Sequence, residues 1–438
     1  MNNKTADILL LHGTIVTMDP QRRVIPDGGI AIHGNSIIAI DTADAIKKNY
    51  SASEIINVPH HAILPGFING HVHAAMNLLR GIADNLPLEQ WLNNKILPLE
   101  KKLLNDDFVY TGTALATLEM IQSGITTAVD MYLLEDVAAQ AFCDYGMRAL
   151  VGYTIVDQAD RLIAAEKFVA RWKEHPYIRP VLAPHSLYAV PEQILCATRD
   201  MAKSLHVPLM MHFAETASEL ETLQMRYGLT PCQLLIQNEL LSQHLILAHA
   251  VHLSEDDIKL LASCDKLGII HCPTSNMKLA SGVAPVTTML QHNIPLGIGT
   301  DGTASNNALN MFSEMKIASL LQSETTHNAQ ALPAQTTLEL ATIRGAQALH
   351  AEKYIGSIEV GKFADIITIA LDTLHQIPAY DIASTLVYAS YPADVQTVII
   401  NGITKLREGK LCFDEHRIDQ LKNTAASYRT TILKLSKT

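Results

Sequence analysis

Eight short apolar segments follow one another through the middle of this chain, and a stretch with helical spacing separates each from the next. Runs of Val, Ile and Leu bounded by Gly, Pro or Asp are typical of buried strands. Strands that alternate with helices pair in parallel, and eight such units favour a closed (β/α)8 barrel. The expected strands cover residues 65–73, 124–132, 147–157, 178–188, 207–215, 244–252, 267–275 and 294–302.

The two ends of the chain have a different pattern. Residues 1–62 contain short apolar strands separated by Gly, Asp and Asn, and similar strands return after residue 356. We therefore expect the two ends to meet in one small β domain. The predicted architecture is an α/β protein with three parts: the first part of a β-sandwich (1–62), a TIM-like (β/α)8 barrel (63–355), and the second part of the sandwich with a C-terminal helix (356–438).

Composition argues against several kinds of partner. The chain has 438 residues and a formal net charge of -11, so it offers no positive surface for nucleic acid or for an anionic membrane. No stretch approaches the roughly 18 apolar residues of a membrane helix, and the N-terminus does not resemble a signal peptide. The 6 cysteines have no C-x-x-C spacing, which is typical of reduced thiols in a cytoplasmic protein.

Polar residues gather at the C-terminal ends of the expected strands. In a (β/α)8 barrel these ends form the mouth where catalytic groups lie. Histidines elsewhere, such as His60 and His292, are expected in loops or at the surface. The residues at strand ends are His71, His73, Asp130, His185, His212, Glu215, His249, His271 and Asp301.

Four of these residues form a plausible ligand set for one metal ion. His71 and His73 are two residues apart on an extended segment, so their imidazoles leave the same face. His212 comes from the fifth strand and Asp301 from the eighth, which neighbours the first in a closed barrel. Three imidazoles and a carboxylate suit a single zinc ion that keeps one position open, with iron or manganese as alternatives. Taken alone, Asp301 could equally be a turn residue.

Two further strand-end residues are suited to proton transfer. Glu215 lies three residues after His212, where a carboxylate can accept a proton from a metal-activated water and pass it to a substrate. His249 is placed to hydrogen-bond the attacking oxygen or the developing tetrahedral centre. The alternative for Glu215 is a structural one, because an acidic residue is common in the first turn of a helix.

Several motifs together resemble the amidohydrolase superfamily. They are PGFINGHVH, HFAET, LAHAVHL, HCPTSNMKLASG and GTDGTASNN, followed by GSIEVGKFADIITI near the C-terminus. The similarity covers nearly the whole chain and implies a (β/α)8 barrel with a sandwich built from both ends. Because the fourth strand carries APHSLY and no lysine, the chain resembles the mononuclear branch. Within it, WLNNKILPLE, GMRALVG and SNMKLASG are similar to the 5'-methylthioadenosine/S-adenosylhomocysteine deaminases.

The resemblance implies a role for each candidate residue. Zinc would bind His71, His73, His212 and Asp301; Glu215, His249 and Asp301 would be catalytic; and Glu100, Arg148, His185, Glu215 and Ser305 would contact the substrate. Glu100 suits ribose hydroxyls, since a carboxylate accepts two hydrogen bonds. However, Glu100 could also lie on a solvated helix face, and Arg148 could be an ordinary surface residue. Ser186, Leu187 and Ala214 depart from the family pattern and bear on the choice of substrate.

The expected reaction is zinc-dependent hydrolytic deamination of an adenine nucleoside to its inosine analogue and ammonia. The alternatives are a deaminase or chlorohydrolase of another ring, such as guanine, a pterin or an s-triazine, and a non-catalytic structural relative. The expected partner is a small-molecule nucleoside. Because families of this kind often form homo-oligomers, we also expect a homo-oligomer here.

Overall fold

The computed structural model describes residues 4–156 and 160–435 and contains the eight-stranded parallel barrel that the sequence predicts. A main-chain hydrogen bond from Asp301 N to His71 O (2.9 Å) joins the segment after the last strand to the first strand and nearly closes the barrel. Asp157, the expected end of the third strand, lies outside the described residues. The strands, in hydrogen-bonded order, are β6 (Phe67–Val72), β7 (Ile125–Tyr132), β8 (Arg148–Ile155), β9 (Ile178–Pro184), β10 (Leu209–Phe213), β11 (Leu245–His249), β12 (Leu267–His271) and β13 (Leu296–Ile298).

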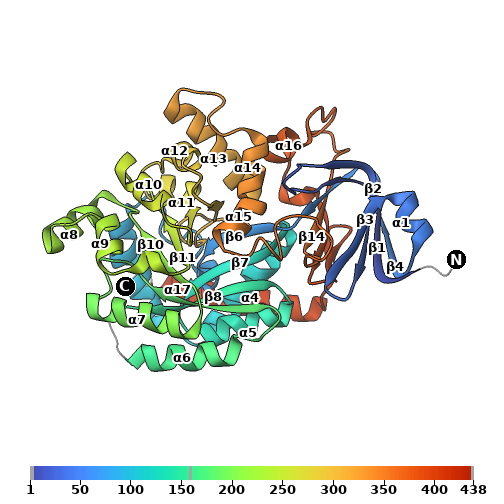
Figure 1. The fold of residues 1–438 in the computed structure, drawn as a ribbon. Coiled ribbons are helices and arrows are strands. Elements are labelled where there is room, and N and C mark those ends of the chain that lie inside the picture. Colours follow the sequence, from blue (N-terminus) through green and yellow to red (C-terminus); the bar gives the residue numbers. More distant parts are fainter. Residues whose placement is uncertain (1–3, 157–159, 436–438) are drawn as a thin grey trace.

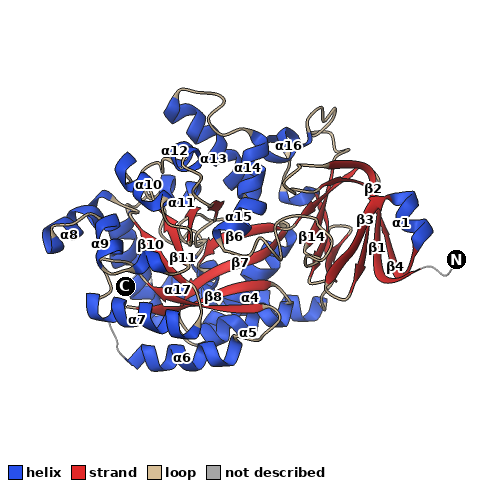
Figure 2. Ribbon diagram, viewed as in Figure 1, coloured by secondary structure: helices blue, strands red, loops and turns tan. Residues whose placement is uncertain are grey.

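Helices form an outer layer around these strands (Figures 1 and 2). Gly124, in the left-handed region at φ 82°, follows the end of the first long helix, as its position in the sequence predicts. The main helices are α4 (Asp106–Gln122), α5 (Glu135–Tyr145), α6 (Asp160–Trp172), α7 (Glu192–Leu205), α8 (Ala217–Tyr227), α9 (Pro231–Gln237), α10 (Glu255–Ala262), α11 (Pro273–Lys278), α12 (Val286–Gln291), α13 (Met311–Thr326), α14 (Ala334–Leu340) and α15 (Ile343–Ala348).

Shorter helical segments occupy the loops. Three of them, α2, η2 and α3, follow one another between residues 88 and 103. The segments are α1 (Ala43–Asn49), η1 (Ala74–Leu79), α2 (Leu88–Trp91), η2 (Leu92–Ile96), α3 (Leu97–Leu103), η3 (Leu240–Ser242), α16 (Ile382–Ser384), η4 (Thr385–Ala389) and η5 (Pro392–Asp394).

Alternation along the strands decides which side chains reach the barrel axis. In β10, Leu209 and Met211 pack in the large core between the sheet and the helices, whereas Met210 packs in a separate cluster with Ile68 and Ile246. That second cluster fills the interior of the barrel. Because successive side chains point to opposite faces, His212 continues the inward face of Met210. The strand therefore delivers an imidazole to the mouth of the barrel.

Strands from both chain ends form the second sheet, so the predicted fold class is confirmed. Hydrogen bonds link all nine strands into one mixed sheet, in which β14 pairs with β5 and so joins the two ends. This sheet includes residues up to Pro65, three beyond the expected boundary at 62. Its strands are β1 (Lys4–Val16), β2 (Val24–His33), β3 (Ser36–Thr42), β4 (Tyr50–Asn57), β5 (His61–Pro65), β14 (Ile366–Ala370), β15 (Val395–Ile400), β16 (Ile403–Arg407) and β17 (Lys410–Leu411).

The last described element is α17 (Glu415–Leu435), which packs against α4. The Tyr428 hydroxyl donates a hydrogen bond to Asp107 of α4 (2.8 Å), and Arg417 forms an ion pair with Asp144 of α5 (3.0 Å). Over the described parts of the chain, no helix combines the length and the apolar character that crossing a membrane requires.

Candidate metal and catalytic site

Three imidazoles and one carboxylate converge at the mouth of the barrel. His71 lies in β6, His73 directly before η1, His212 in β10, and Asp301 just after β13. Each of the three histidines offers a ring nitrogen, and these nitrogens lie within 4.8 Å of one another. Asp301 Oδ1 lies 3.2 Å from His73 Nε2 and 3.6 Å from His71 Nε2. The structure therefore brings together the four residues that the sequence suggests as metal ligands.

The hydrogen bonds around these rings leave two Nε2 atoms facing the centre. His73 Nδ1 contacts the Met131 carbonyl, and His212 Nδ1 contacts the His185 carbonyl at 3.0 Å. A carbonyl only accepts, so both Nδ1 atoms carry a proton and both Nε2 atoms face the centre. Burial lowers the pKa of His73, but its hydrogen bond to Asp301 outweighs this and raises the pKa to about 9. These two Nε2 atoms nevertheless lie 3.3 Å apart. Two ring nitrogens this close, beside the Asp301 carboxylate, need a positive charge between them, which a proton on His73 or a metal ion supplies, so the arrangement suits a metal ion.

His71 supports the same conclusion. Its side chain is fully buried, and neither ring nitrogen has a hydrogen-bond partner. An unpartnered buried polar group costs about 1–3 kcal/mol, and a metal ion would remove that cost. Burial, followed by the neighbouring histidines, lowers the pKa of His71 and of His212 well below the ordinary value. Both imidazoles are therefore neutral, which is the form that binds a metal.

Two serines and a backbone amide hold the Asp301 carboxylate. Ser275 Oγ and Ser305 Oγ donate to Oδ2, at 2.6 Å and 2.9 Å, and Gly302 N donates to Oδ1 at 2.7 Å. Asp301 itself has φ 61°, a left-handed conformation that is strained for a residue other than glycine. Ser305 was expected to contact the substrate. In the structure its buried hydroxyl is bonded to Asp301 and to the Gly302 carbonyl (3.1 Å), so a contact with the substrate stays a prediction.

Glu215 and His249 face each other beside the ligand set. Glu215 Oε2 lies 3.8 Å from His249 Nε2. His249 Nδ1 bonds to Asn276 Oδ1 (2.8 Å), so its Nδ1 carries the proton and its Nε2 points to Glu215. Burial raises the pKa of Glu215, with the nearby His249 opposing the rise. A raised pKa makes a carboxylate a stronger base, which suits a group that has to take up a proton and pass it on.

A cavity of about 180 Å³ extends outward from these groups. Besides the ligand and catalytic residues, its polar lining comes from Glu100, Tyr132, Thr154, His185 and Tyr188. The Tyr132 hydroxyl donates to Glu100 Oε1 (2.5 Å), and burial raises the pKa of Glu100. The remaining lining is apolar: Met76, Leu88, Trp91, Leu92, Leu97, Met131, Leu133, Val156 and Leu279.

The structure places the other predicted substrate residues in different ways. Glu100 and His185 line the cavity, and burial lowers the pKa of His185 to about 4, so its ring is neutral. Arg148 lies at the N-terminal end of β8, at the opposite end of the barrel from the cavity, and is not among the residues that line it. Thr154, six residues further along the strand, lines the cavity, which puts Arg148 roughly 20 Å away at 3.3 Å per residue.

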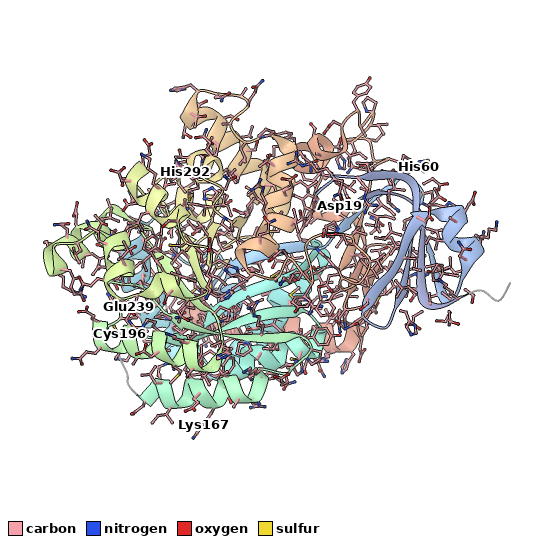
Figure 3. The ribbon with its side chains drawn as sticks, in the orientation of Figure 1. Asp19, His60, Lys167, Cys196, Glu239 and His292 are labelled. Carbon is pink, nitrogen blue, oxygen red and sulfur yellow. The ribbon has the colours of Figure 1, made fainter. Side chains whose placement is uncertain are left out.

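Arg148 instead joins the barrel to the terminal sheet. Its guanidinium forms two hydrogen bonds to the Asp365 carboxylate (2.7 and 3.2 Å) and one to Asn401 (3.3 Å). It also lies over the ring of Phe363, 4.3 Å from the centroid. Among the other histidines, His60 directly precedes β5 of the terminal sheet and His292 directly follows α12 (Figure 3). His271 is fully buried, and neither of its ring nitrogens has a hydrogen-bond partner.

Several functional residues were not singled out from the sequence. Ser275 hydrogen-bonds Asp301, and Asn276 hydrogen-bonds His249. Both belong to the motif HCPTSNMKLASG, so the motif indicated this segment although neither residue was given a role. Tyr132 is the last residue of β7, and the end of this strand lies at the barrel mouth. That position could have marked Tyr132 as a candidate site residue. Ser186, Leu187 and Ala214, which depart from the family pattern, are all buried and do not line the cavity.

Comparisons with known proteins agree with this architecture. Residues 62–404 match the amidohydrolase family. A 5-methylthioadenosine/S-adenosylhomocysteine deaminase from Syntrophobacter fumaroxidans is 40% identical over 419 residues, which cover 94% of this chain and 95% of that protein. The crystal structure of a zinc-bound adenosine deaminase from Xanthomonas campestris has a TM-score of 0.95 and 35% identity, covering 99% of this chain and 100% of that one.

A more distant structure shares the fold alone. Zinc-bound atrazine chlorohydrolase TrzN from Arthrobacter aurescens has a TM-score of 0.89 at 23% identity and covers 96% of this chain and 99% of its own. The match over residues 62–404 and the identity over nearly the full length settle the family. With its mononuclear ligand set at the barrel mouth, the chain belongs to the amidohydrolase family and is a hydrolase that acts on C–N bonds.

Proposed function

We propose that this protein is a zinc-dependent deaminase of adenine nucleosides that carry a 5'-thioether, chiefly 5'-methylthioadenosine and S-adenosylhomocysteine. The observation that supports this most strongly is the grouping of charges in the cavity. The ligand set, Glu215 and His249 lie together at its inner end, and Glu100 is the one further carboxylate among its described lining residues. The first group suits hydrolysis of a ring amine, and Glu100 suits the sugar attached to that ring.

The residues divide the chemistry between them. A zinc ion held by His71, His73, His212 and Asp301 would supply a Lewis acid that lowers the pKa of a water. Glu215 takes the proton that this water loses and delivers it to the ring nitrogen beside the amino-bearing carbon. The water oxygen bonds to that carbon and gives up its second proton to the amino group as it becomes the ring carbonyl; the carbon–nitrogen bond then breaks and the amino group leaves as ammonia.

His249 acts on the same oxygen. Asn276 fixes the orientation of its ring through Nδ1, so Nε2 stays directed at the reaction centre. There its lone pair can accept a hydrogen bond from the attacking water, which orients that water and can take up a proton from it. The buried site excludes bulk water, which strengthens each of these electrostatic interactions.

Glu100 and the apolar lining support the choice of substrate. A carboxylate has about four acceptor positions, so Glu100 can bind ribose hydroxyls while it also accepts from Tyr132. Beyond the sugar, a thioether meets apolar side chains such as Trp91, Leu97 and Leu279. The amidohydrolase relatives named as deaminases of these two nucleosides support the same assignment.

Two broader expectations accompany this function. The 6 cysteines are all free thiols, which fits the reducing cytoplasm that we propose as the location. A homo-oligomeric state stays a prediction from the family resemblance, to be measured by light scattering.

Ammonia release from a substrate panel tests the proposed function. We would compare zinc-loaded protein on 5'-methylthioadenosine, S-adenosylhomocysteine, adenosine, guanine and an aminotriazine, with Glu100→Ala as the companion variant. The expected result is a preference for the thioether nucleosides and a raised KM for them in Glu100→Ala. Preference for a free base, with no effect of the substitution, would overturn the substrate. No ammonia from any compound, with zinc bound, would overturn the deaminase assignment.

A further inference from the structure

Glu219 fastens the turn that carries Glu215. It lies in the first turn of α8, and its carboxylate reaches back toward the end of β10. Its Oε1 accepts a hydrogen bond from Ala214 N (3.1 Å), and its Oε2 accepts one from Glu215 N (2.9 Å). The Glu219 side chain is buried, so these two bonds are not shared with solvent.

This contact differs from ordinary helix capping. Thr216 is the N-cap residue, and its side chain accepts a hydrogen bond from Glu219 N (3.2 Å). In a capping box, a glutamate at this position would return the bond to the backbone N–H of the cap residue. Glu219 instead bonds the two amides that precede Thr216. Its carboxylate therefore fixes the strand end rather than only the helix.

The turn that Glu219 holds is strained. Ala214 has φ 48°, in the left-handed region where a residue with a Cβ atom is destabilised by about 1–3 kcal/mol. Its carbonyl accepts hydrogen bonds from Val251 N (3.0 Å) and His252 N (2.9 Å), in the loop after β11. The two amides held by Glu219 and the carbonyl held by that loop keep Ala214 in this conformation. Without them the turn would relax and move Glu215.

We propose that Glu219 is a positioning residue for Glu215, which it keeps in reach of the metal ligands and of His249. The inference rests on the catalytic role that the proposed function gives to Glu215. Because a displacement of about 1 Å can cost about 100-fold in rate, loss of this contact lowers kcat. The cavity walls do not involve Glu219, so KM stays close to the wild-type value.

The test compares Glu219→Gln with Asp394→Asn, a matched substitution far from the cavity. Asp394 is also a buried carboxylate that accepts a main-chain hydrogen bond at the start of a helical segment, from Tyr391 N (2.8 Å). In Glu219→Gln the side-chain NH2 group faces one of the two amides, so one hydrogen bond is lost and two donors oppose each other. Glu219→Asp, which keeps the carboxyl group but is one methylene shorter, serves as a milder second variant.

We expect kcat of Glu219→Gln to fall about 10–100-fold with KM within about twofold and the bound metal retained. Hydrogen exchange should accelerate in the peptide that contains the amides of residues 214 and 215. Asp394→Asn should lose thermal stability without a change in kcat, and Glu219→Asp should lie between wild type and Glu219→Gln. An unchanged kcat in Glu219→Gln, or a loss of activity that only parallels loss of metal or of folded protein, would overturn the proposal.

The exchange measurement also separates this proposal from the proposed function. If the wild-type protein released no ammonia from any compound, the function would fail while the amides of residues 214 and 215 could still be measured. Protection that is present in the wild type and lost in Glu219→Gln would support the positioning role. Equal exchange in both proteins would overturn it.

Discussion

Ser305→Ala separates support of a metal ligand from contact with the substrate. In the structure, the Ser305 hydroxyl donates to Asp301 Oδ2 at 2.9 Å and shares its proton with the Gly302 carbonyl at 3.1 Å. The neighbouring Ser275 hydroxyl donates to the same Oδ2 at 2.6 Å. Ser305→Ala and Ser275→Ala each therefore weaken the support of Asp301 without removing any residue that lines the cavity.

The expected magnitude follows from these hydrogen bonds. A hydrogen bond to a charged group contributes about 1.5–3 kcal/mol. Because the Ser305 proton is shared, its loss should lie near the lower figure, or about tenfold in metal affinity. The shorter Ser275 bond should lie near the upper figure, or about 100-fold, which is within the range seen when groups that orient metal ligands are removed.

The assay has two parts. Zinc affinity is measured by competition with a chromophoric chelator, and kcat and KM are measured on the zinc-saturated enzyme. We expect Ser305→Ala to bind zinc more weakly and to keep a KM close to wild type once saturated. Ser319→Ala is the control, because the buried Ser319 hydroxyl donates to the Leu332 carbonyl (2.7 Å) and touches neither the cavity nor the ligands. A raised KM with unchanged zinc affinity would refute this reasoning and support Ser305 as a substrate contact.

Three further outcomes follow from the structure. Arg148→Ala should destabilise the protein by about 3–5 kcal/mol, because it leaves the Asp365 carboxylate buried and unpaired, while KM stays unchanged; a thermal melt and a saturation curve check both. Burial raises the pKa of Glu314 to about 7, so between pH 4.5 and 7 the folded state keeps a proton that the unfolded state has lost. The free energy of unfolding should therefore fall by up to about 3 kcal/mol as pH rises through this window. The Tm of Glu314→Gln, taken relative to the Tm of wild type at the same pH, should be higher at pH 8 than at pH 5. The described lining of the cavity contains no Lys or Arg, so the carboxylate of S-adenosylhomocysteine lacks a partner there. We therefore expect kcat/KM for 5'-methylthioadenosine to exceed that for S-adenosylhomocysteine by about tenfold or more. Equal values would contradict this, and Arg226, which donates to the Tyr188 carbonyl, would then be the cation to substitute.

Much of the fold could be predicted because its signals are local. The apolar strands and the helical spacing between them indicate the barrel, and the period of two in His71 and His73 places both rings on one face. The four ligand candidates were recognisable because each lies at or just past the end of a strand, and these ends must lie at the barrel mouth. Motif resemblance then supplied Glu100 and His185, and both line the cavity.

The rest depends on contacts between distant parts of the chain. The partner of Arg148 is Asp365, 217 residues away, and nothing in the local sequence indicates that pairing. Its position at the start of a strand, however, already places it at the end of the barrel away from the mouth. Whether the Ser305 hydroxyl faces substrate or Asp301 depends on the conformation of the loop after β13. Glu219 has the sequence position of an ordinary acidic residue in a first helical turn, so only the structure distinguishes its contact with Ala214 and Glu215.

The most direct test of the central claim measures metal content and turnover together in Glu215→Gln. The substitution removes a titrating carboxylate and leaves the four proposed ligands in place. We expect one zinc ion per chain in both wild type and variant, with ammonia release from 5'-methylthioadenosine abolished in the variant alone. Loss of zinc from the variant would make Glu215 a ligand or a structural residue, and undiminished ammonia release would remove it from the chemistry; either result would contradict the account.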